Sequence, residues 1–266
     1  MRIRGLLITV AFLASALWGC GMGNAGSDSS SADDLSAFPQ LVSSDYDLSK
    51  YDDNNNMYFE CYGNTWSLTE DSADVYPKLV SSLKKIDEHE KKYFKENLEL
   101  YDKEAKSFAS GHNGACYECY ANTGISCADP KVVSLVKTQL TFFGGAHPDT
   151  VTIAYNMDAR TGKFILLSDV IKDQQELSLI LAEALTEQYS DHQFFGLEDT
   201  LNTLKMNVSP FDEKTLSPQY IYSFNPNGLT FYFNPAVLSP YSDGGEQINL
   251  TYEDLSTVLN KKYAQP

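Results

Sequence analysis

The feature that most constrains this chain is a long apolar stripe between Ser72 and Ser110. Apolar and aromatic side chains recur there every three or four residues, which predicts one long amphipathic helix or two helices joined end to end. Glu90 falls inside the stripe, and the lysines and glutamates on the other side are typical of a solvated helix face. The stripe consists of Val75, Leu79, Leu83, Ile86, Tyr93, Tyr101, Ala105 and Phe108.

Runs of β-forming residues lie on both sides of this stripe, and a second amphipathic helix is predicted to begin at Asp173. Alternating aromatic residues around Asn225–Gly228 predict a hairpin, and Gly63-Asn64 is expected to form a turn. No internal repeat is expected. The sequence predicts an α+β fold with an antiparallel sheet, a long helix in the N-terminal half and a second helix packed on the sheet. The predicted strands cover residues 57–62, 65–68, 117–121, 132–143, 150–157, 164–167, 220–224, 229–233 and 247–250.

The N-terminus has the pattern of an export signal. Arg2 and Arg4 precede an apolar run that ends at Trp18. This run is too short to cross a membrane, because a spanning helix needs about 20 apolar residues. Gly19-Cys20 then resembles the end of a bacterial lipoprotein signal, although a plain signal peptide with an incidental cysteine is the alternative. The resemblance implies a signal peptide at residues 1–19 and acylation of Cys20 with palmitate-type chains.

Residues 20–40 contain mostly Gly, Ser, Asp and Ala at their start, which predicts a flexible tether on the lipidated cysteine. Such a tether would hold the folded part at a membrane surface in the cell envelope. The membrane would be the outer one in a Gram-negative cell and otherwise the cell membrane, with the protein on its outer face.

Acidic residues dominate the charge of this chain. The net charge is −16, and it becomes −18 once residues 1–19 with Arg2 and Arg4 are removed. This charge argues against nucleic-acid binding, which needs a basic surface. It favours encounter with a cationic partner, although acidity could also serve solubility alone.

Four cysteines follow Cys20, and in an exported chain such thiols normally pair. Two disulfides are therefore expected, with three connectivities that the sequence does not separate. Cys116-x-x-Cys119 also has the spacing of zinc ligands or of a redox pair, but the second half of a zinc pattern is missing. No metal or cofactor is expected. The disulfide candidates are Cys61, Cys116, Cys119 and Cys127.

A polar corner at residues 142–162 holds the best candidate binding residues, namely His147, Asp149, Asp158 and Tyr155. The glycine pair and the proline beside the histidine are also what a tight connection between strands needs. Turn architecture, a ligand-contact surface and catalysis all remain open for this corner. No catalytic residue is assigned, because the histidines form no metalloprotease motif and no nucleophile elbow occurs.

The order of several segments resembles a known family. Gly144-Gly-Ala-His-Pro148 is followed by Tyr155-Asn-Met-Asp158 and Thr161-Gly-Lys163, and much later by Gly228-Leu-Thr-Phe-Tyr-Phe233 and Ile248-Asn-Leu-Thr-Tyr-Glu-Asp-Leu255. This order is similar to the extracytoplasmic C-terminal domain of RsiV, a lysozyme-sensing anti-sigma factor. The same domain accompanies PdaC-like peptidoglycan deacetylases and occurs in lipoproteins of unknown function. The likeness covers roughly residues 41–260.

The resemblance implies an N-terminal lobe at residues 41–130 and an RsiV-like C-terminal lobe at residues 131–266. It implies a non-enzymatic, membrane-anchored envelope lipoprotein that binds a protein or a cell-wall ligand. The partner would be a cationic protein such as lysozyme, or it would be peptidoglycan. The alternative is a cell-wall glycan hydrolase or a deacetylase-associated domain that uses His147 and Asp149.

Overall fold

The computed structural model describes residues 38–112, 115–211 and 218–263, and it has the α+β fold that the sequence predicts. The predicted signal peptide, Cys20 and most of the predicted tether lie outside these residues. The described residues belong to one compact unit that begins at Leu35. The boundary expected at residue 130 falls between two neighbouring strands of one sheet.

Six strands form the larger sheet in the order β1-β3-β4-β5-β6, with the short β2 beside β3. All neighbours are antiparallel except β3 and β4, which run parallel. The purely antiparallel sheet expected from the sequence is therefore corrected at this one pair. The strands are β1 (Leu41–Asp47), β2 (Lys50–Tyr51), β3 (Met57–Leu68), β4 (Tyr117–Ala128), β5 (Val132–Phe142) and β6 (Asp149–Asp158).

Strand β3 passes straight through Gly63-Asn64, so the turn expected there does not form. Gly63 is needed in this strand for another reason. The ring of Tyr46 on β1 lies against its backbone, where a Cβ would collide with the phenol. The glycine thus permits close packing of an aromatic ring rather than a change of chain direction.

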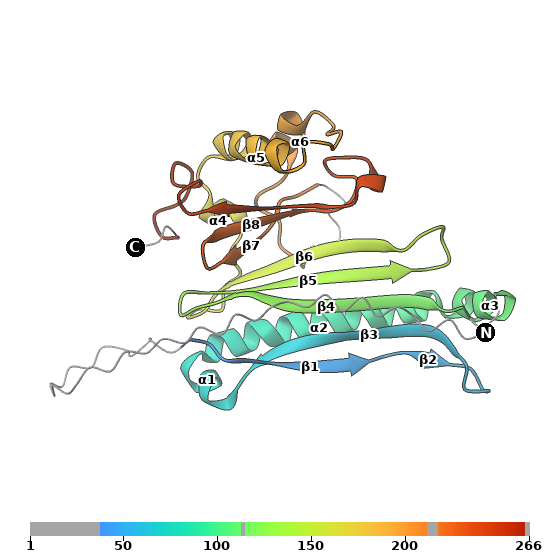
Figure 1. The fold of residues 1–266 in the computed structure, drawn as a ribbon. Helices are drawn as coiled ribbons and strands as arrows, with labels where there is room; N and C mark the ends of the chain where they lie inside the picture. Colours follow the sequence, from blue (N-terminus) through green and yellow to red (C-terminus); the bar gives the residue numbers. More distant parts are fainter. Residues whose placement is uncertain (1–37, 113–114, 212–217, 264–266) are drawn as a thin grey trace, which may run out of the picture. The chain divides into compact units, whose positions relative to one another are not determined.

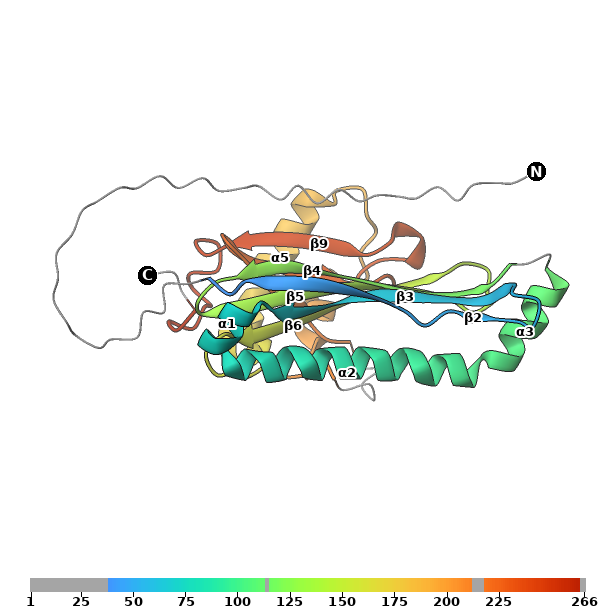
Figure 2. The same cartoon turned by 90° about the horizontal axis from the view of Figure 1, so that it is seen from below.

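The long apolar stripe becomes three consecutive helices, α1 (Glu70–Val75), α2 (Pro77–Leu100) and α3 (Asp102–Gly111). Pro77 occupies the first turn of α2, where its missing N–H costs no hydrogen bond, and so α1 and α2 are separate. Figure 2 shows α2 running along one face of the six-stranded sheet. Its stripe is buried against β3, β5 and β6 through Leu79, Leu83, Ile86, Phe94 and Leu98.

A second, three-stranded sheet has the order β7-β8-β9. The predicted hairpin around Asn225–Gly228 is confirmed as β7 and β8. The predicted second helix is α5, and it packs on this smaller sheet through Leu177, Leu181 and Leu185. In Figure 1, α5 and α6 lie on the far side of β7 and β8 from β6. The elements are α4 (Leu167–Val170), α5 (Gln174–Gln188), α6 (Leu197–Thr203), β7 (Ile221–Asn225), β8 (Gly228–Phe233), the 3-10 turn η1 (Tyr241–Asp243) and β9 (Glu246–Thr251).

Polar side chains join the two sheets. Strand β7 is an edge strand, so its outward backbone groups need partners. Asn156 donates to the Tyr222 carbonyl oxygen at 2.7 Å, and the Phe224 N–H donates to Ser134 Oγ at 3.2 Å. We call the side chains that make these bonds the polar junction, and they are Ser126, Ser134, Asn156 and Asn234.

The remaining members of the polar junction work in the same way. Ser126 Oγ donates to the Phe224 carbonyl oxygen at 2.8 Å. Asn234, which follows β8, accepts from the Thr152 N–H on β6 at 2.7 Å and donates to the Thr152 carbonyl oxygen at 3.3 Å. The edge strand of each sheet therefore receives hydrogen bonds from side chains that belong to the other sheet or to its loops.

None of the helices in the described residues combines the length and the hydropathy needed to cross a bilayer.

We expect Asn156→Ala to lower the free energy of unfolding by about 1–3 kcal/mol, because it leaves the buried Tyr222 carbonyl without this donor and the Ser134 hydroxyl proton without its acceptor. Urea denaturation of the folded chain would measure this loss. Asn122→Ala, at an exposed position of β4, is the matched control and should change stability by less than about 0.5 kcal/mol. Equal effects of the two substitutions would contradict the role given to the polar junction.

Candidate functional site

The residues expected to bind a ligand do not converge. His147 lies in the exposed turn before β6, where its ring stacks on Tyr241 at 4.7 Å and Nδ1 lies 3.3 Å from the Pro148 carbonyl oxygen. The Tyr241 hydroxyl donates to the Pro148 carbonyl at 3.1 Å and lies 3.3 Å from an Asp149 oxygen. The corner is thus tied to η1 by its own contacts.

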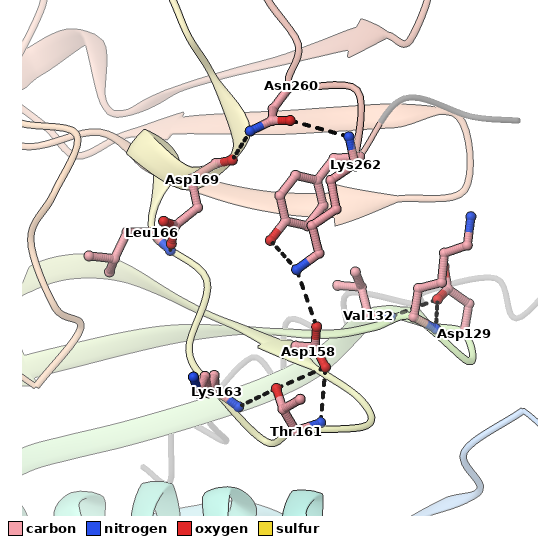
Figure 3. A network of polar contacts seen from close by, with 11 residues as sticks. Asp129, Val132, Asp158, Thr161, Lys163, Leu166, Asp169, Asn260 and Lys262 are labelled. Atoms are coloured by element: carbon pink, nitrogen blue, oxygen red, sulfur yellow. Dashed lines mark hydrogen bonds and ion pairs between the residues drawn. The ribbon is translucent and has the colours of Figure 1, made fainter.

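Asp158 lies at the opposite end of β6 from Asp149, about 30 Å away at the rise of a strand. Figure 3 shows its carboxylate accepting from the Thr161 N–H and hydroxyl, both at 2.9 Å, and lying 3.5 Å from Lys262 Nζ. Asp158 therefore stabilises the turn after β6 and attaches it to the C-terminal segment. It shares no cleft with His147.

Tyr155 is fully buried beneath α2, and its hydroxyl donates a short hydrogen bond to Glu90. Burial, followed by the charge of Glu90, raises the pKa of Tyr155 well above its usual value. Lys137 of β5 forms an ion pair with the same carboxylate at 2.5 Å. The sequence analysis did not predict that Glu90 and Lys137 form a buried pair. Each is a charged residue at a position where the pattern of its helix or strand predicts a buried side chain.

A short repeat appears where the two parallel strands meet. Phe59-Glu-Cys-Tyr-Gly-Asn-Thr65 and Tyr117-Glu-Cys-Tyr-Ala-Asn-Thr123 have the same residue at five of seven positions. The register sets Glu60 beside Glu118 and Tyr62 beside Tyr120. The expectation of no internal repeat is therefore wrong, and the repeat gives two equivalent copies of one pattern at adjacent strands.

The repeat puts acidic and tyrosine side chains on the face of the sheet opposite α2. The rings of Tyr62 and Tyr120 lie 4.4 Å apart, and Tyr62 is 46% exposed. The Tyr120 hydroxyl donates to Glu60 at 2.5 Å. Strand β1 adds Asp47 directly beside Tyr62. We call this surface the acidic tyrosine face, formed by Asp45, Asp47, Glu60, Tyr62, Glu118 and Tyr120.

The carboxylates of this face repel one another. Burial raises the pKa of Glu118, and the charge of Glu60 beside it raises that pKa further. Burial and the hydrogen bond to Glu60 also raise the pKa of Tyr120. Within the described part of the chain, none of the four carboxylates of the face forms an ion pair with a Lys, Arg or His side chain. The face therefore presents uncompensated negative charge beside aromatic rings.

The four predicted disulfide cysteines are free thiols in this structure, so the two expected disulfides are not seen. Cys127 lies eight residues beyond Cys119 on β4, about 26 Å at the rise of a strand, and it cannot reach any of the other three. Cys119 faces α2, whereas Cys116 lies near the acidic tyrosine face, so the Cys-x-x-Cys pair forms neither a shared zinc site nor a disulfide. The strand geometry allows one disulfide at most.

One group of side chains could hold a divalent cation. Among residues 38–112, 115–211 and 218–263, potential metal ligands converge at Glu60, Cys116 and Glu118, whose ligand atoms lie within 4.8 Å of one another. Thiolate and carboxylate oxygens are both ligands of zinc. Burial and the two carboxylates raise the pKa of the Cys116 thiol, which disfavours the thiolate in the absence of a cation.

One segment in the C-terminal part of the chain matches the model of a described family. The family model "Protein of unknown function (DUF3298)" matches residues 166–253. This stretch is a DUF3298 domain. It contains α4, α5, α6 and the β7-β8-β9 sheet. The acidic tyrosine face lies outside the DUF3298 domain, whereas β7 within the domain meets the polar junction.

Two solved structures have a fold similar to this chain. A DUF3298 family member from Bacteroides fragilis has a TM-score of 0.59 at 17% identity, covering 86% of this chain and 96% of its own. A DUF3298 family protein from Pseudomonas aeruginosa has a TM-score of 0.50 at 15% identity, covering 85% of this chain and 97% of its own. The likeness thus includes the larger sheet and concerns the fold alone. No curated protein matches the chain, and the RsiV-type family stays a resemblance.

We expect Glu118→Gln to raise stability at pH 7 by about 0.2–0.5 kcal/mol, because it removes a like charge opposite Glu60 on a solvent-screened surface. The folded chain holds the Glu118 proton more tightly than the unfolded chain does, so ionisation of Glu118 lowers stability as pH rises. The gain should therefore disappear as pH falls from 7 to below about 4.5, the ordinary glutamate value.

Thermal unfolding at pH 7 and at pH 4 would measure this difference. Glu187→Gln, at an exposed position of α5, serves as the control and should give no gain at either pH. A loss of stability in Glu118→Gln at pH 7 would contradict the repulsion inferred between the two carboxylates.

Proposed function

We propose that this chain is a non-enzymatic, membrane-anchored binding protein of the bacterial envelope whose acidic tyrosine face captures a cationic protein. The observation that carries the proposal is the pair of equivalent carboxylates on β3 and β4 beside two tyrosine rings, without a positive partner from the described chain. Like charges placed side by side lower stability. Such a cost is expected where a surface serves binding rather than folding.

The geometry of the face suits arginine and lysine side chains. Adjacent strands are about 4.8 Å apart, so the carboxylates of Glu60 and Glu118 could both accept hydrogen bonds from one guanidinium group. A cation placed there would lie near the rings of Tyr62 and Tyr120, and aromatic rings attract cations. A basic partner would thus remove the repulsion and gain aromatic contact at once.

A lysozyme-like protein is the sharpest choice of partner. The net charge of this chain would attract such a basic protein over long distances, which raises the association rate at low salt. The resemblance to the lysozyme-sensing RsiV domain supports the same choice. The glycan hydrolase alternative has less support, because His147 stacks on Tyr241 and Asp149 contacts the Tyr241 hydroxyl instead of facing a shared cleft.

We expect the folded chain to bind a c-type lysozyme in calorimetric titration at low salt, and the affinity to fall as salt is raised from 20 to 200 mM. The variant Glu60→Gln/Glu118→Gln should weaken binding about tenfold or more. Charged groups at the centre of an interface contribute more to the binding free energy than charges at its rim. The matched control is Glu183→Gln/Glu187→Gln, which removes the same charge from exposed positions on α5.

Two results would contradict lysozyme as the partner or the acidic tyrosine face as the binding surface. Absence of binding at tens of micromolar protein and low salt would exclude lysozyme. Equal weakening in the variant and its control would show that net charge alone attracts the partner and that the acidic tyrosine face is not the contact.

The membrane anchor is a separate part of the proposal. We expect acylation at Cys20 to hold the mature chain in the membrane fraction, whereas Cys20→Ala should move it to the soluble envelope fraction. Fractionation of cells that express each form, with mass spectrometry of the N-terminal peptide, would measure this. A wild-type chain that remains soluble and unacylated would refute the anchor and leave the binding face untested by that result.

A further inference from the structure

A cleft of about 270 Å³ lies around the edge strand β6, away from the acidic tyrosine face. Helix α2, strands β5 and β6, and the segments 206–210 and 219–222 provide parts of its walls. Its volume is slightly below the range of about 300–1,000 Å³ for drug-sized ligand sites, which suits one sugar residue or a dipeptide. Phe164, Met206, Val208, Pro210 and Ile221 give it an apolar side.

The polar end of the cleft contains a buried ion pair. Lys137 and Glu90 keep only 3% and 5% of their side-chain surface exposed. The Lys137 ammonium donates to Glu90 at 2.5 Å and to the Gln139 side-chain oxygen at 3.0 Å. The other Glu90 oxygen accepts from Tyr155. Replacing such a pair by apolar groups is often neutral or stabilising, so stability alone does not explain its presence.

This arrangement leaves unused hydrogen-bond donors at the polar end of the cleft. An ammonium group has three N–H donors, and within the described residues Lys137 uses two of them. The Gln139 amide donates one N–H to the Tyr93 hydroxyl at 3.1 Å and has a second. The unused N–H groups could donate hydrogen bonds to an oxygen atom of a ligand.

The charge of the site selects the kind of oxygen. Glu90 already balances the charge of Lys137, so an anionic ligand would bring an unpaired charge into a buried place. A neutral carbonyl oxygen avoids this cost and still accepts strong hydrogen bonds from the ammonium group. The apolar wall beside it would cover a small acyl group.

We propose that this cleft binds a neutral secondary amide with a small acyl group, with the amide oxygen bound by Lys137 and Gln139 and the acyl group against the apolar wall. Two sources share this chemistry, namely N-acetylated amino sugars and N-acylated peptides. The site is separate from the acidic tyrosine face and does not depend on capture of a cationic protein.

Saturation-transfer NMR of the folded chain would test the proposal with N-acetylglucosamine and with N-acetylalanine methylamide as probes. Binding with a Kd on the order of 1 mM is expected for a ligand of this size. Glucosamine, which lacks the acyl group, should give no signal at the same concentration. Binding of one probe alone identifies the source, and binding of both identifies the amide as the shared element.

The variant Lys137→Met/Glu90→Gln removes both charges together and so avoids leaving one buried charge unpaired. We expect it to stay folded and to weaken binding at least tenfold. Val208→Trp, which fills the apolar side, should also abolish the signal, whereas Lys172→Met at an exposed position should not change it.

Three results would overturn the proposal. They are absence of binding by both probes at 20 mM to the folded chain, equal binding of glucosamine, and full binding by the folded double variant and by Val208→Trp. Loss of lysozyme binding has no bearing on any of these outcomes.

Discussion

The structure depends on hydrogen bonds from polar side chains of the polar junction to the backbones of two edge strands. An edge strand normally exposes its N–H and C=O groups or pairs with another strand. Here Asn156 and Ser134 take the place of a pairing strand for β7, and Asn234 does the same for β6. Because both sets of groups are largely buried, a loss of either partner would leave unsatisfied polar atoms in the interior.

The polar junction also explains why the DUF3298 domain and the larger sheet occur as one body. Hydrophobic contact alone would tolerate several orientations of one sheet against another. The hydrogen bonds to Tyr222, Phe224 and Thr152 depend on direction, so they can form in only one of these orientations. That orientation leaves the acidic tyrosine face uncovered on β3 and β4, and it places residues 206–210 and 219–222 beside β6, where they line the cleft. Both candidate binding surfaces therefore result from the same packing.

Much of the fold follows from local patterns in the sequence. The apolar stripe predicted the helical region, and alternation around Asn225–Gly228 predicted the β7-β8 hairpin, because each pattern is read within a few residues. Gly63 was misread because a glycine in a turn and a glycine under a packed ring look alike in sequence. The parallel pairing of β3 with β4 spans almost sixty residues, and no local pattern encodes it.

The candidate site was harder to predict for the same physical reason. His147 and Asp158 are polar residues near glycines, a pattern that turns and binding sites share, and the structure places them in separate turns. Glu90 and Lys137 place charges within the apolar patterns of α2 and β5, which indicates a buried pair. Their contact, however, depends on how α2 lies on β5. The seven-residue repeat was visible in the sequence, and only the parallel register showed that its two copies lie side by side.

Native-state hydrogen exchange across a urea series tests the central claim most directly, with the N–H groups of Phe224 and Thr152 as the reporters. If the polar junction unites the two sheets, both groups should exchange only through global unfolding, with the same free energy and the same urea dependence as core amides of β5 and β8. Exchange of Phe224 and the rest of the DUF3298 domain at a lower free energy than β5 would contradict the claim, because the two sheets would then open independently.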